Sequence, residues 1–278
     1  MNIQLLKQLM RLKQDKLHKI LCTYLNKNYD TVVIRDKFII AMGNIPIGLV
    51  AHLDTVHPMA PREFFYDQEA KVLWSPQGLG ADDRAGVYAI LQIIEAGYRP
   101  HIIFCHDEET GGIGAKEIIK MFPDSPFENL KCLIELDRSG DIDCVFYDCG
   151  NDDFEQYIEK FGFKTDIGSF SDISILAPQW EVAAVNLSVG YENEHTKAEY
   201  IKLAVLEATI EKVKYILDEE PNMINYAYVP KIYYNYRDTT CLFCQRPVKK
   251  GKGLMIPTSM GSFYETCFEC YNQYFEEV

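Results

Sequence analysis

The chain contains 278 residues, of which 47% are hydrophobic and 25% are charged, as in ordinary globular proteins. Its 41 acidic and 28 basic residues give a formal net charge of −13, which argues against broad binding to nucleic acid or to anionic membranes, since both require a basic face. We find no apolar run of about 18 residues and no signal-peptide pattern at the charged N-terminus. We therefore expect a cytoplasmic protein without membrane contact.

The order of apolar patterns along the chain predicts the fold class. An amphipathic helix is expected over residues 1–25, followed by two strands within 31–42. Short apolar runs typical of buried strands occupy 47–54, 101–106, 130–137, 143–149 and 182–190. Helical spacing marks 87–94, 112–122, 152–163 and 197–217. Because strands alternate with helices, we expect an α/β fold with a mostly parallel central sheet flanked by helices.

The composition changes near residue 220, where a segment rich in Tyr and Asn contains two prolines. We interpret residues 1–220 as a catalytic domain, 221–237 as a linker and 238–278 as a small separate module.

Acidic and histidine side chains follow most of the expected buried strands. Ligands bind beyond the carboxyl ends of the strands in open α/β sheets, so these side chains should converge on one crevice. Crowded carboxylates repel one another, and divalent cations relieve that repulsion. Three carboxylates and two imidazoles would suit two zinc ions with a bridging hydroxide. The five candidate ligands are His52, Asp82, Glu109, Asp137 and His195.

Five short motifs carry a family resemblance. In chain order they are HLDTV, GADDRAG, DEETGGIGA, ELD and EHT, within about residues 45–218. This set resembles the co-catalytic di-zinc exopeptidases and amidohydrolases, which include zinc aminopeptidases, tripeptidases and deacylase-like enzymes. The resemblance implies that His52 and Asp137 hold one zinc ion and that Glu109 and His195 hold the other. It also implies that Asp82 bridges both ions.

The resemblance also assigns supporting roles. Aligning DDR with the family's DDK selects Asp82 rather than Asp83 as the bridge, and the peptide bond between them is often cis in relatives. Asp54 would fix the tautomer of His52. Glu108 would be the general base, which takes a proton from the attacking water and delivers it to the leaving amine.

The interval between the Asp137 and His195 positions is 58 residues, and strands and a helix already occupy it. Relatives in the deacylase branch insert a lid domain there, so we expect a lidless enzyme of the aminopeptidase-like branch. The acids Asp172 and Glu194 are candidate partners for the amine of a substrate. A helix N-cap is an equally good interpretation of Asp172.

The function most consistent with these residues is hydrolysis of a peptide or small amide by a di-zinc enzyme, foremost as an aminopeptidase. The alternative enzyme is an N-deacylase or other amidohydrolase with the same metals. A binding protein that has lost catalysis is the alternative from another class. Such proteins commonly lose the base or a ligand, whereas Glu108 and every ligand position are filled here.

The C-terminal module contains two CxxC pairs separated by 22 residues. This spacing is typical of a structural zinc site of the ribbon kind, and a segment so short needs metal to fold. Two disulfides are the alternative. Basic and acidic residues balance in this module, which favours protein docking or oligomerisation over nucleic acid. The four predicted ligands are Cys241, Cys244, Cys267 and Cys270.

Overall fold

The computed structural model describes residues 1–231, 233–234, 237–257 and 263–275. The chain divides into two compact units, Met1–Val229 and Pro230–Val278. Residues 221–229, which we expected in the linker, pack on the first unit, where Met223 and Tyr226 join the core. Residues 232, 235–236, 258–262 and 276–278 of the expected linker and module lie outside the described residues.

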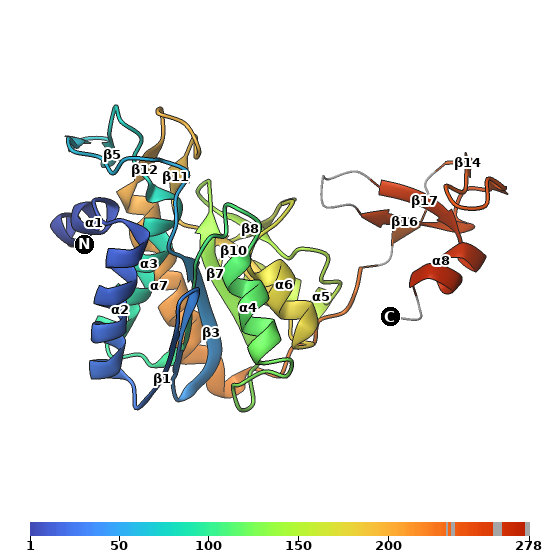
Figure 1. The fold of residues 1–278 in the computed structure, drawn as a ribbon, viewed down its shortest axis with the longest axis horizontal. Helices are drawn as coiled ribbons and strands as arrows, with labels where there is room; N and C mark the ends of the chain where they lie inside the picture. Colours follow the sequence, from blue (N-terminus) through green and yellow to red (C-terminus); the bar gives the residue numbers. More distant parts are fainter. Residues whose placement is uncertain (232, 235–236, 258–262, 276–278) are drawn as a thin grey trace. The chain divides into compact units, whose positions relative to one another are not determined.

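An eight-stranded sheet forms the centre of the first unit (Figure 1). Its four middle strands, β6, β3, β7 and β10, are parallel, whereas β2 and β8 pair antiparallel with them at either side. The strand order across the sheet is β1 (Thr31–Arg35), β2 (Phe38–Met42), β6 (Pro100–Cys105), β3 (Ile45–His52), β7 (Cys132–Arg138), β10 (Ala184–Ser188), β8 (Asp143–Val145) and β9 (Lys164–Thr165).

Helices cover both faces of this sheet (Figure 1). Successive residues of β3 face opposite cores: Leu49 and Ala51 belong to one cluster, and Val50 belongs to the other. This double burial explains why the strand is apolar throughout. One core takes α1 (Ile3–Met10), α2 (Gln14–Asn28), α3 (Ala81–Glu95), α5 (Asp152–Glu159) and α7 (Leu203–Glu219), and the other takes α4 (Ile113–Met121) and α6 (Ile173–Gln179). The predicted α/β fold class is confirmed.

Two local expectations differ from the structure. The N-terminal helix is broken after Met10 into α1 and α2. The last long helix begins at Leu203 rather than at 197, because residues 200–202 pair with β5 instead. They belong to a second, four-stranded sheet of β11 (Tyr191–Glu192), β12 (Tyr200–Lys202), β5 (Val72–Trp74) and β4 (Phe65–Asp67). A short 3-10 helix, η1 (Glu220–Asn222), follows α7.

A buried histidine makes the stability of this unit dependent on pH. His101 is 5% exposed, stacks on Phe127 and accepts the N–H of Gly43 at Nδ1. Burial lowers the pKa of His101 to about 4. The unfolded state, with a pKa near 6.5, then takes up the proton first, so stability falls as pH drops from about 6.5 to 4.

We expect this histidine to cost about 2 kcal/mol of unfolding free energy between pH 7.5 and pH 5. The His101→Asn variant keeps an acceptor for Gly43 but has no proton to gain, so its loss over this range should be smaller by that amount. Urea unfolding of both proteins at the two pH values measures the difference. Parallel pH dependence in the two proteins would contradict the assignment.

The second unit is small and has a three-stranded sheet, a two-stranded hairpin and one helix. Its buried hydrophobic cluster contains only Cys241, Val248 and Cys270 among the described residues. Its elements are β13 (Tyr233–Tyr234), β14 (Thr239–Thr240), β15 (Pro247–Val248), β16 (Gly253–Pro257), β17 (Phe263–Cys267) and α8 (Phe268–Phe275).

Over the described ranges of both units, none of the helices has the length and apolar character required to span a membrane.

Candidate metal centre

The parallel strands of the first unit deliver the predicted ligands to one edge of the sheet. His52 is the last residue of β3, and Asp137 lies near the end of β7. Glu109 lies in the loop after β6, and His195 lies between β11 and β12. Asp82 comes at the start of α3. The convergence follows from strand direction, because neighbouring parallel strands end at the same edge.

Asp82 joins two sets of side chains. Its Oδ1 lies 2.9 Å from Nε2 of His52, and its Oδ2 lies 3.1 Å from Nε2 of His195. His195 Nε2 also lies 3.0 Å from Oε2 of Glu109, and His52 Nε2 lies 3.4 Å from Oδ1 of Asp137. One carboxylate therefore contacts both imidazoles, each of which contacts a further carboxylate.

Asp83 is placed differently, although it is also buried. Its two oxygens accept the backbone N–H groups of Gly86 and His52, at 2.8 and 3.2 Å. These bonds tie Asp83 to the start of α3 and the end of β3, and leave Asp82 to contact both histidines. The peptide bond between the two aspartates is cis, as the resemblance implies. Asp83 and Asp137 nevertheless lie near enough to His52 to form a second group of potential metal ligands.

Asp54 supports the site from behind His52. Its Oδ1 lies 3.2 Å from Nδ1 of His52, and its carboxylate accepts the N–H groups of Glu108 and Glu109 at 3.0 and 3.1 Å. An ionised carboxylate at Nδ1 favours a proton on that nitrogen, which would leave Nε2, the atom that faces Asp82 and Asp137, free to bind a metal ion. Asp54 thereby also holds in place the loop that carries Glu108, the expected general base.

The electrostatics show a strong excess of negative charge. Burial, together with Asp137 and Asp82, raises the pKa of Glu108 to about 8. Burial and the neighbouring Asp82 raise the pKa of Glu109 to about 7. Hydrogen bonding to Asp82 raises the pKa of His195 to about 9. The carboxyl groups of Glu108 and Glu109 would therefore ionise fully at neutral pH only with positive charge beside them.

The donor set fits divalent cations. Oε1 of Glu109 is buried and has no hydrogen-bond partner among the described residues. The potential ligand atoms of His52, Asp82 and Glu109 lie within 4.8 Å of one another, and so do those of His52, Asp83 and Asp137. Imidazole nitrogens and carboxylate oxygens are ordinary zinc ligands.

The two candidate substrate-binding acids lie in different environments. Asp172 is fully buried, so it cannot face a substrate in this structure. It occupies the N-cap position of α6, but its side chain does not cap the helix, and both of its oxygens lack partners among the described residues. Glu194 is half-buried and directly precedes His195. We therefore retain only Glu194 as a candidate for binding a substrate amine.

The loop before Asp82 is held by a residue that no motif in the sequence marks. Glu199 is 1% exposed, and its carboxylate accepts four consecutive backbone N–H groups, from Leu79 to Asp82, at 2.7–3.2 Å. It also pairs with Nε2 of His57 at 2.8 Å. The sequence did not indicate this contact, because Glu199 lies 117 residues from Asp82. We also expected the segment that contains Glu199 to be helical.

The 58-residue interval contains no inserted domain. Its strands β8, β9 and β10 belong to the central sheet, and α5 and α6 cover that sheet. Asn186 of β10 accepts the N–H of Asp137 at 2.9 Å, and the hydroxyl of Tyr191 donates to Oδ1 of Asp137 at 3.1 Å. The interval therefore positions one of the candidate ligands.

The comparison with solved structures agrees with this architecture. A tripeptidase from Staphylococcus aureus matches with a TM-score of 0.61 at 14% identity, over 80% of this chain and 98% of that one. The aminopeptidase PepT from Bacillus cereus matches with a TM-score of 0.59 at 16% identity, over 79% and 98% of the two chains. The TET1 peptidase of Pyrococcus horikoshii, which can assemble into a tetrahedron or an octahedral shell, matches with a TM-score of 0.52 at 14% identity, over 77% and 98%.

The chain has the fold of these peptidases. No family model matches the sequence, and no curated protein matches it.

The four cysteines of the second unit form a separate candidate zinc site. Their sulfur atoms lie within 4.8 Å of one another, and those of Cys244 and Cys267 are 3.7 Å apart. Two sulfurs bound tetrahedrally at about 2.3 Å from one zinc ion would be separated by about 3.8 Å. All nine cysteines of the chain are free thiols in the structure. The geometry therefore favours a shared metal over paired disulfides.

Proposed function

We propose that the chain is a di-zinc aminopeptidase that removes the N-terminal residue of short peptides. The contact of Asp82 with both His52 and His195 carries this proposal, because one carboxylate is thereby available to two adjacent metal ions. The tripeptidase and aminopeptidases that share the fold support a peptide substrate.

The contacts support one assignment of the ligands. His52, Asp82 and Asp137 would hold one ion, and His195, Asp82 and Glu109 would hold the other. When bound, two divalent ions supply positive charge that polarises the scissile carbonyl and acidifies water.

The remaining side chains handle protons and orientation. Glu108 accepts a proton as the water oxygen attacks the carbonyl carbon. It then donates that proton to the amide nitrogen, the C–N bond breaks, and a carboxylic acid and an amine leave. Asp54 keeps His52 in the tautomer that presents Nε2, and Tyr191 and Asn186 hold Asp137 in place.

A free amine on the substrate should matter because Glu194 adjoins His195 at the site. An ammonium group paired with that carboxylate would place the first peptide carbonyl at the metal centre. We expect N-acetylation of Leu-Gly-Gly to reduce kcat/KM at least about tenfold, equivalent to roughly 1.4 kcal/mol of transition-state stabilisation. Steady-state assays of the zinc-loaded full chain on both peptides, with detection of released leucine and acetate, measure this.

The assay also separates the alternatives. Release of acetate from the blocked peptide at least as fast as release of leucine from the free one would replace the aminopeptidase with an N-deacylase. Absence of hydrolysis by folded protein carrying its metals would favour a binding protein.

The second unit has a structural role in this proposal. Cys241, Cys244, Cys267 and Cys270 would hold one structural zinc ion, which stabilises a unit whose described core is very small. We propose that this unit serves protein docking or oligomerisation, and the assembly of the TET1 peptidase into shells supports an oligomeric state. A cytoplasmic location agrees with an enzyme that acts on short peptides.

A further inference from the structure

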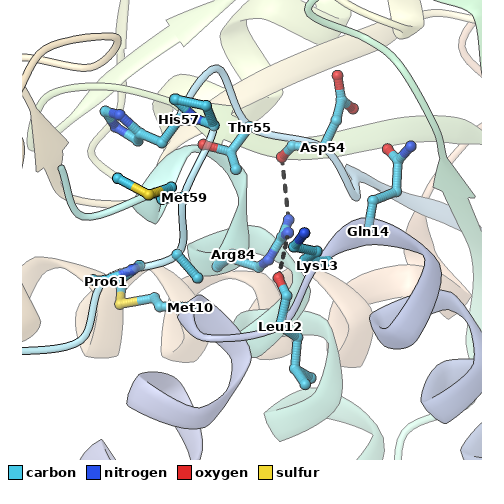
Figure 2. Close-up of a pocket in the computed structure, with 13 residues that line it drawn as sticks. Met10, Leu12, Lys13, Gln14, Asp54, Thr55, His57, Met59, Pro61 and Arg84 are labelled. Atoms are coloured by element: carbon cyan, nitrogen blue, oxygen red, sulfur yellow. Dashed lines mark hydrogen bonds between the residues drawn. The ribbon is translucent and has the colours of Figure 1, made fainter. Parts of the chain in front are cut away.

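A cavity of about 270 Å³ lies between the connection of α1 to α2 and the segment that follows β3 (Figure 2). Apolar side chains line one side of the cavity, and cationic side chains lie on the other. In Figure 2, Met10, Met59 and Pro61 gather on the left and Lys13 lies on the right, with Arg84 between them. The cavity therefore has an apolar part and a cationic part. Of the lining residues, Asp54 also supports the metal centre, whereas Met10, Lys13 and Met59 have no role there.

Arg84 is 1% exposed and forms no direct ion pair among the described residues. Its Nη1 donates to the carbonyl oxygens of Leu53 and Asp54 at 2.5 and 3.1 Å, and its Nη2 donates to that of Leu12 at 3.1 Å. Its Nε is buried and has no hydrogen-bond partner in the described part of the chain. A buried donor without a partner is costly, so among the described residues the guanidinium lacks both a direct counter-ion and one hydrogen bond.

Two further groups next to this guanidinium can bind an anion. Lys13 is exposed, and within the ranges that the structure describes its ammonium group forms no ion pair. Thr55 lines the same cavity and carries a hydroxyl group. The nearest carboxylate does not neutralise them: Asp54 is engaged by His52 and by the N–H groups of the Glu108 loop, and Figure 2 shows its carboxylate directed away from Arg84.

We propose that this cavity binds the carboxylate of a small, partly apolar molecule, either a free amino acid or the C-terminal end of a short peptide. The carboxylate would accept hydrogen bonds from Lys13 and Thr55 and would lie beside the Arg84 guanidinium, whose charge no carboxylate pairs directly among the described residues. The apolar body would pack on Met10 and Met59. A water molecule occupies about 30 Å³ of liquid, so the cavity suits a molecule the size of an amino acid.

Occupancy of the cavity would be coupled to the metal centre. Arg84 holds the backbone of Leu53 and Asp54, and the Asp54 carboxylate orients His52. A ligand that engages Arg84 therefore acts on the residues that present one of the candidate metal ligands.

Calorimetric titration of the zinc-loaded full chain tests the site, with N-acetyl-L-leucine and its neutral amide as probes. The acid should bind at least about tenfold more tightly than the amide, because charge-assisted hydrogen bonds are lost in the amide. Lys13→Gln should weaken binding of the acid about tenfold, and Thr55→Val should weaken it severalfold. Lys16→Gln removes an exposed lysine of α2 that does not line the cavity, so it should bind as the wild type does.

Two results would overturn the proposal. One is the absence of binding heat at millimolar N-acetyl-L-leucine. The other is binding that is unchanged by both Lys13→Gln and Thr55→Val, which would place the carboxylate on the metal ions instead.

The source of the carboxylate is then distinguished by kinetics, and this part rests on the proposed function. If the substrate supplies it, KM for Leu-Gly-Gly should be about tenfold below that for Leu-Gly-Gly-amide, and Lys13→Gln should abolish the difference. If a free amino acid supplies it, the two KM values should agree, and N-acetyl-L-leucine should change kcat on the amide. A chain that hydrolyses neither peptide would contradict the peptidase, while the calorimetry would still decide the cavity.

Discussion

Glu108→Gln should lower kcat on a free tripeptide by about 10²–10⁴-fold, the usual contribution of a general base. Glutamine has nearly the same shape as glutamate but cannot accept a proton from the attacking water. The side chain is not among the assigned metal ligands, so metal content should stay at the wild-type level. Steady-state kinetics and metal analysis of the same preparation measure both properties.

The neighbouring acid provides a matched control. Asp107 pairs with Lys37 at 2.5 Å and accepts the amide of Gln14 at 2.9 Å, so its carboxylate is engaged outside the metal centre. Asp107 has a positive φ, which asparagine tolerates. Asp107→Asn should therefore retain kcat within about twofold. Activity of Glu108→Gln close to that of Asp107→Asn would remove Glu108 from the mechanism.

The part of the site that sequence could predict is the part set by strand direction. His52 and Asp137 lie at the ends of short apolar runs, and each run is a parallel strand in the middle of the sheet. Once these runs are recognised as strands, their polar ends must meet at one edge. The order of the motifs along the chain added His195 and Asp82, whose positions depend on loops.

What sequence could not predict depends on contacts between distant segments. Glu199 binds the backbone ahead of Asp82, and nothing in its neighbourhood distinguishes it from a helical surface residue. Tyr200 pairs with Trp74 in a small second sheet, where both strands are only three residues long. We expected Asp172 either to pair with a substrate amine or to cap a helix, but packing of α6 against the sheet buries it. Each outcome is a tertiary effect without local periodicity.

The cavity next to Arg84 was also beyond sequence analysis. Its two sides come from the break between α1 and α2 and from the segment after β3, and we expected a continuous helix at the break. The family that the sequence resembles has DDK where this chain has DDR. In the structure the guanidinium fork of Arg84 donates to three carbonyl oxygens on two separate segments. A lysine ammonium group offers no such planar fork.

Asp82→Ala should release both metal ions of the catalytic centre, because this carboxylate contacts His52 and His195 through different oxygens. Glu109→Ala should release only one, since Glu109 contacts His195 alone of the two histidines. The Cys₄ site of the second unit serves as an internal reference. We expect three zinc ions per chain in the wild type, two in Glu109→Ala and one in Asp82→Ala.

Elemental analysis after dialysis against zinc-free buffer measures these numbers, and circular dichroism confirms that each variant is folded. Unfolding is not the expected cause of metal loss, because removing Asp82 reduces the repulsion that raises the pKa of Glu108 and Glu109. Loss of a single ion from Asp82→Ala would assign the bridge to Asp83, which lies near His52 and Asp137. Retention of all three ions would show that metal binding does not require a carboxylate at position 82. Asp82 would then not be a ligand shared by two ions.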